Sequence, residues 1–100
     1  MYARIATFEG EPDGVEQAIE AARGQAEANW ESPPEGLEVV KELWMLVDRE
    51  GRKGLGITIY ETEEDLRRAD NALNAMSPPD AGGSRTGVSV YEVELHKERS

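Results

Sequence analysis

Ser32-Pro33-Pro34-Glu35 recurs as Ser77-Pro78-Pro79-Asp80, and this repeat decides the fold predicted for the 100-residue chain. Each copy follows an amphipathic helical stretch and precedes a run of β-forming residues. A strand–helix–strand unit that occurs twice predicts the order β-α-β-β-α-β.

This order is that of the ferredoxin-like α+β fold, in which a four-stranded antiparallel sheet carries two helices on one face. We expect residues 1–100 to form one such domain, because the chain is too short for two. The second face of the sheet then needs a cover, and a second copy of the chain is the simplest one. The sequence therefore predicts a homodimer.

The alternation of apolar and polar residues places the strands. They are expected at Tyr2–Phe8, Val39–Asp48, Gly54–Tyr60 and Gly87–Leu95. The second strand is apolar on both faces, which predicts burial on both sides. Gly51 is expected to take positive φ in the turn before the third strand.

The helices are marked by apolar residues at helical spacing and by capping residues. Asp13 is expected to cap the first helix with Glu16, and Thr62 the second with Asp65. The first half of the chain is longer by about two helical turns, and a connecting loop is expected from Asn29 to Gly36.

The isoleucine-rich third strand suggests which face the helices cover. Leu55, Ile57 and Ile59 are expected beneath the helices, with Thr58 and Tyr60 on the uncovered face. Arg4, Ala6 and Phe8 join that uncovered face, together with part of the Trp44 face. An exposed apolar face of this size predicts an interface, so the Thr58 and Tyr60 side is expected to bury about 800 Å² per partner.

Composition excludes several classes of function. The chain has no cysteine and a single histidine, His96, so thiolate sites and a multi-histidine metal site are excluded within one chain. The net charge of −10 argues against nucleic-acid binding. No targeting segment or apolar span is evident, which predicts a soluble cytoplasmic protein without membrane contact.

Three segments resemble the small proteins of the dimeric α/β-barrel superfamily that are related to antibiotic-biosynthesis monooxygenases. They are the opening residues 1–10, the strand pair and helix start at residues 44–48 and 54–65, and the closing Val90-Tyr91-Glu92-Val93. That group includes cofactor-independent monooxygenases, haem-degrading enzymes and members without known activity.

The resemblance implies a pocket of aromatic and polar residues. The candidates that it suggests are Arg4, Phe8, Trp44, Tyr60, Asn71 and Met76. Haem-degrading members use a histidine on the second helix, and the corresponding stretch Glu64–Asn74 has none, so no cofactor or metal is expected. The predicted function is binding of a small aromatic ligand without catalysis. The alternative is a cofactor-independent monooxygenase that acts on an aromatic or quinone-type substrate.

Each candidate also has a structural interpretation. Trp44 is typical of a core position, and Tyr60 of a strand end that packs its ring. Arg4 lies inside a strand and needs a partner, either an ion pair with Glu42 or a bound anion. Trp30 is expected over a subunit boundary or a pocket mouth, and His96 on the surface.

Overall fold

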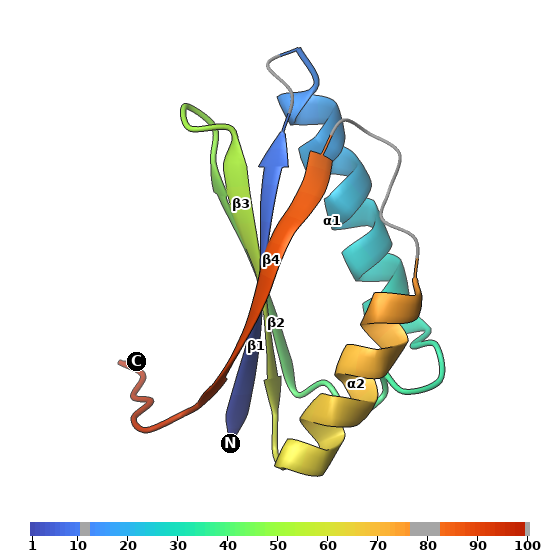
Figure 1. The fold of residues 1–100 in the computed structure, drawn as a ribbon, viewed down its shortest axis with the longest axis vertical. Coiled ribbons are helices and arrows are strands. Elements are labelled where there is room, and N and C mark those ends of the chain that lie inside the picture. The colour runs from blue at the N-terminus through green and yellow to red at the C-terminus, as the bar shows by residue number, and fades with distance from the viewer. Residues whose placement is uncertain (11–12, 77–82, 100) are drawn as a thin grey trace.

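The computed structural model describes residues 1–10, 13–76 and 83–99 as an antiparallel sheet with two helices on one face (Figure 1). The elements are β1 (Tyr2–Gly10), α1 (Val15–Glu31), β2 (Glu42–Asp48), β3 (Lys53–Tyr60), α2 (Glu63–Ala75) and β4 (Gly83–Glu92). The four strands lie in the order β2-β3-β1-β4. The ferredoxin-like fold predicted from the repeat is confirmed, although its second marker, residues 77–80, lies outside the described residues.

The two helices cover the opposite face of the sheet from the one predicted. Arg4 pairs with Thr58 across β1 and β3, so the two side chains share a face, and Arg4 bonds to α2. The helices therefore cover the face of Arg4, Thr58 and Tyr60, and Tyr60 is fully buried. The opposite face is uncovered in Figure 1. We call it the open face; it carries Ala3, Ile5, Trp44, Leu46, Leu55, Ile57, Ile59 and Tyr91.

The reason for this reversal is the size of the residues. Beneath the helices the sheet carries Ala6, Gly54 and Gly56, and these small residues leave room for an arginine and a tyrosine. The bulky aliphatic residues of β3 point the other way. The prediction assumed that the bulkiest face belongs to the helices, and a shift of one residue reverses every side chain.

The core lies under α2 and is small. Leu37, Tyr60, Leu66 and Ala69 form its buried cluster. Thr62 caps α2 as predicted, and its hydroxyl accepts a hydrogen bond from the Asp65 backbone N–H at 3.1 Å. The second helix is thereby fixed at its start and along its apolar face.

The first helix differs from its prediction at both ends. Gly14 stands at its N-cap without a side-chain hydrogen bond, so the predicted Asp13 cap is wrong. The helix continues to Glu31 and takes in Asn29 and Trp30, which were expected in a loop. The greater length of the first half is thus helical, since α1 has 17 residues and α2 has 13.

The hairpin between β2 and β3 also differs. β2 begins at Glu42 and is an edge strand, so Leu43, Trp44 and Leu46 are exposed instead of buried on both sides. Positive φ falls on Arg52, at 54°, and not on Gly51. Gly51 takes a different part in the turn: its backbone N–H donates a hydrogen bond to the Asp48 carboxylate at 3.0 Å.

The last strand begins earlier and ends earlier than expected. β4 covers Gly83–Glu92, in place of Gly87–Leu95. Its pairing with β1 is interrupted between Thr7 and Phe8, so that Phe8 pairs with Arg85. This bulge brings Arg85 to the face beneath the helices.

Candidate functional site

A cleft of about 800 Å³ lies between α1 and the helix-covered face of the sheet. Its α1 wall is made of small and aliphatic residues, Val15, Ala18, Ile19, Ala22 and Ala26, and ends at Trp30. The sheet forms its floor, with Ala6, Phe8, Leu43, Met45, Val47 and Gly56. Leu73 and Met76 close the end nearest α2.

The cleft exists because small residues face each other across it. None of the residues of α1 is buried, although its apolar stripe faces the sheet. Opposite that stripe, a Cβ atom built on Gly56 would have Phe8 Cε2, at 3.7 Å, as its nearest neighbour. Alanine side chains opposite glycine are too small to fill the space between a helix and a sheet to the density of a protein interior. The space left between them is open to a ligand.

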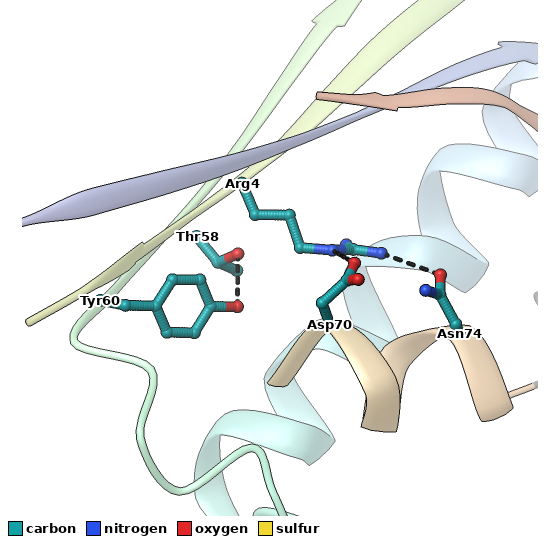
Figure 2. Close-up of polar contacts among 5 residues, drawn as sticks. All are labelled: Arg4, Thr58, Tyr60, Asp70 and Asn74. Carbon is teal, nitrogen blue, oxygen red and sulfur yellow. Dashed lines mark hydrogen bonds and ion pairs between the residues drawn. The ribbon is translucent and has the colours of Figure 1, made fainter. Parts of the chain in front are cut away.

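Arg4 lines one end of this cleft, which we call the polar end, and Figure 2 shows the contacts of its side chain. It is buried, with 4% of its surface exposed, and its Nε donates to Asp70 Oδ1 at 2.7 Å. Its Nη2 donates to Asn74 Oδ1 at 3.3 Å. The expected ion pair with Glu42 is therefore replaced by one with Asp70 on α2. Burial of a guanidinium has a large desolvation cost, which the hydrogen-bonded Asp70 carboxylate partly offsets.

Tyr60 lies behind the polar end and affects it only through its hydrogen bond to Thr58. Its hydroxyl donates to Thr58 Oγ1 at 2.8 Å, as Figure 2 shows. Burial raises the pKa of the Tyr60 phenol, so the ring stays neutral at physiological pH. Thr58 lines the cleft and Tyr60 does not.

The predicted site residues divide into two groups. Arg4, Phe8 and Met76 come together in the cleft. Trp44 touches the cleft from the edge strand, but its pairing with Ile57 places its side chain on the open face, where it is 52% exposed. Asn71 lies on the exposed surface of α2 and does not line the cleft.

Sequence reasoning missed the polar partners of Arg4 and most of the α1 wall. Asn74 stands one turn after Asp70, and this i, i+4 spacing on one helix face was the available signal. Thr58 shares a strand face with Arg4, so the correct choice of face would have found it. Trp30 lines the cleft while remaining 53% exposed, which agrees with the predicted place at a pocket mouth.

In the described part of the chain, no group of three or more His, Cys, Asp or Glu residues is placed to hold a metal ion. Neither described helix has the length and apolar character needed to cross a membrane. The cytoplasmic location expected from the sequence stays a prediction.

Comparison with known proteins gives structural neighbours only. No known protein family matches the sequence, and no curated protein does. A protein from Deinococcus radiodurans assigned as an antibiotic biosynthesis monooxygenase superposes with a TM-score of 0.65 at 9% identity, over 100% of this chain and 99% of that one.

Two further solved structures share the fold. An antibiotic biosynthesis monooxygenase matches with a TM-score of 0.58 at 15% identity, over 95% of this chain and 100% of the other. A mutant of MhuD with two manganese protoporphyrin IX molecules bound per active site matches with a TM-score of 0.55 at 18% identity, over 99% and 100% of the two chains. The structural neighbours are thus proteins of the antibiotic-biosynthesis-monooxygenase type, as the sequence resemblance suggested. At these identities the likeness establishes a common fold and leaves the activity open.

Proposed function

We propose that this protein binds a small, largely apolar aromatic molecule in the cleft between α1 and the sheet. The observation that carries the proposal is the cleft of about 800 Å³, which combines an apolar floor and wall with the buried Arg4 at one end and charged residues, among them Glu9, Asp48 and Lys53, beside the β2–β3 hairpin. Ligand sites commonly have volumes of about 300–1,000 Å³ and combine apolar walls with a few polar groups. The solved MhuD mutant, which has this fold, holds flat porphyrin molecules in its active site.

Binding without catalysis is proposed ahead of the monooxygenase alternative because two of the three carboxylates that line the described cleft, Glu38 and Asp48, accept local backbone hydrogen bonds, and the third, Glu9, is exposed to solvent. The pKa of Glu38 is lowered, mainly by a hydrogen bond from its own backbone N–H and also by the Gly36 N–H and the positive charge of Arg68. A carboxylate of lowered pKa is a weak base. Asp48 accepts the Gly51 N–H in the hairpin turn, and the phenol of Tyr60 is buried and neutral.

A haem group does not fit the residues present. The resemblance implies a histidine ligand on the second helix, and α2 has no histidine. His96 follows β4 on an exposed segment, where its Nε2 lies 3.8 Å from Glu98 Oε1. That segment runs on the side of the sheet away from the helices (Figure 1). The proposed ligand is therefore held by the walls of the cleft and by Arg4, and not through iron.

Blocking the cleft tests the proposal. Ala22 faces the cleft and Ala28 lies on the exposed side of the same helix. Planar aromatic compounds should raise the melting temperature of the parent and of Ala28→Trp, and leave that of Ala22→Trp unchanged. At about 100 times the dissociation constant, the ligand should add about 2.7 kcal/mol to the free energy of unfolding. Equal shifts in both variants would place the ligand elsewhere and contradict the proposal.

The proposed working form is a homodimer that packs through the open face. Trp44, Leu46 and Tyr91 are exposed there and adjoin the half-buried Ile5, Ile57 and Ile59. Continuous apolar surface of this kind is unusual on a monomer. Two sheets stacked about 10 Å apart would remove it from water on both subunits.

A matched pair of tryptophans tests the dimer. Trp44 on the open face and Trp30 at the cleft are equally exposed, at 52% and 53%. Light scattering should show twice the chain mass of 11.0 kDa for the parent and for Trp30→Glu, and the chain mass for Trp44→Glu. A parent that is monomeric at micromolar concentration would refute the dimer and leave ligand binding intact.

A further inference from the structure

We propose that the cleft ligand is a carboxylic acid, and that its carboxylate binds to the N–H and O–H groups of Arg4, Thr58 and Asn74. This inference rests on the proposed function, because it names the chemical class of the ligand bound at the same cleft. It follows from the direction of the hydrogen bonds at the polar end, where the acceptors are already used and the donors are not.

Arg4 contributes donors only. A guanidinium has five N–H groups and no acceptor. The described bonds engage Nε with Asp70 and Nη2 with Asn74, and neither involves Nη1. No buried side-chain nitrogen or oxygen of the described residues lacks a partner, so Nη1, which no described bond engages, keeps some exposure, and the cleft is the space that Arg4 lines.

Asn74 is oriented by Arg4. Its amide oxygen accepts the Nη2 hydrogen bond at 3.3 Å, since the alternative orientation would bring two nitrogen donors together. The NH₂ group of the same amide is left for another partner. Asn74 lines the cleft and is exposed, so this NH₂ group is available to a ligand.

Thr58 is oriented in the same way by Tyr60. The Tyr60 side chain is fully buried and has no contact with water for its O–H group. A buried hydroxyl donates to an available acceptor, and Tyr60 donates to Thr58 Oγ1 at 2.8 Å. The Thr58 hydroxyl hydrogen must then point to a different partner, and Thr58 lines the cleft.

Charge favours an anion at this point even though Asp70 pairs with Arg4. Asp70 does not line the cleft; it lies in a separate groove with Tyr2, Arg67 and Tyr91. Its side chain is 30% exposed there, so water screens its charge. A ligand in the cleft meets the guanidinium directly and the Asp70 carboxylate behind it.

The directions of these hydrogen bonds predict the order in which ligands with different polar groups bind. A carboxylate accepts from all three donors and forms charge-assisted bonds, which are about twice as strong as neutral ones. An alcohol accepts weakly. An amine presents further donors to a site of donors, and unpaired buried donors are costly.

The experiment compares naphthoate, naphthylmethanol and naphthylmethylamine of the same ring position, by calorimetric titration at neutral pH. Naphthoate should bind at least about tenfold more tightly than the alcohol, a difference of about 1.4 kcal/mol. The amine should bind most weakly. Because the three compounds share one ring system, the apolar walls contribute equally to each.

Matched variants then locate the carboxylate. Asn74→Asp replaces the donor with an anion at an exposed position, and Asn71→Asp makes the same charge change off the cleft on the same helix. Asn74→Asp should weaken naphthoate at least about tenfold and leave the alcohol within about twofold, while Asn71→Asp changes neither. Thr58→Val should weaken naphthoate and Thr58→Ser should preserve it.

The outcomes separate this inference from the proposed function. Equal affinity for naphthoate and naphthylmethanol, both lost in Ala22→Trp, would overturn the carboxylate site and keep the apolar cleft. A preference for naphthoate that survives Asn74→Asp would also overturn it, because the acid would then bind elsewhere, for example near Arg85. If none of the three compounds binds, the proposed function and this inference fail together.

Discussion

The two helices occupy equivalent places in the repeat, and they are held in different ways. α2 buries Leu66 and Ala69 against the sheet and is capped by Thr62. α1 buries none of its residues and has no side-chain cap. The longer helix is thus the less firmly held of the two. A helix whose apolar face is not satisfied by its own chain is suited to form the wall of a ligand site.

The difference arises from side-chain size as much as from pattern. Both helices carry an apolar stripe, but that of α1 is dominated by alanine, and Gly24 lies within the helix. Most helical stability in proteins comes from packing of the apolar face and not from helix propensity. α1 gains little from packing in the absence of a ligand, so its position should depend on what occupies the cleft.

Replacing a large apolar side chain of each helix by alanine should show the largest difference in the free energy of unfolding. Leu66 is 3% exposed beneath α2, whereas Ile19 faces the open cleft from α1. Leu66→Ala should lower the free energy of unfolding by about 3 kcal/mol, because it leaves a cavity in packed surroundings. Ile19→Ala should cost less than about 1 kcal/mol, because its side chain is already partly hydrated.

Urea denaturation at matched protein concentration measures both values, since a dimer unfolds with concentration-dependent stability. Equal losses for Leu66→Ala and Ile19→Ala would mean that α1 closes onto the sheet in solution. A saturating cleft ligand should increase the loss seen for Ile19→Ala and leave that for Leu66→Ala unchanged.

The order of the elements was predictable because each strand and helix has a local signal. The Ser-Pro-Pro-acid marker at Ser32, the cap at Thr62 and the strand alternation each depend on neighbouring residues. The choice of sheet face was not predictable in this way. Both faces of the strands are apolar, and the deciding contact joins Arg4 to Asp70, which lie 66 positions apart.

The candidate site was predicted in part for the same reason. Arg4, Phe8 and Met76, which line the cleft, are an arginine within a strand and two large apolar side chains, and residues of these types are visible in the sequence. Tyr60 and Trp44 were assigned to the pocket by residue type, and type does not reveal orientation. The cleft itself arises from missing volume between Ala22 and Gly56, which are far apart in sequence.

Removal of the cap residue should affect the start of α2 more than the start of α1. Thr62→Ala should lower the free energy of unfolding by about 1 kcal/mol, because the Asp65 N–H loses its acceptor. Asp13→Ala should change it by less than about 0.5 kcal/mol, because Asp13 is exposed and makes no cap to α1. Thermal unfolding of the two variants measures the difference. A larger loss for Asp13→Ala would show that α1 is capped in solution after all.

The smallest effect is expected at Gly24, in the middle of α1. A Cβ atom added there meets nothing within 4 Å, so Gly24→Ala adds helix propensity without a clash. Glycine is about 0.8–1.0 kcal/mol less favourable than alanine in a helix interior. Gly24→Ala should therefore stabilise the protein by up to about 1 kcal/mol, and Ala28→Gly on the exposed side should cost a similar amount. Chemical denaturation of both variants at one protein concentration measures whether each change raises or lowers the free energy of unfolding. If Gly24→Ala destabilises while Ala28→Gly behaves as expected, the outer surface of α1 is packed against another part of the protein in solution, and α1 is held more firmly than its lack of buried residues indicates.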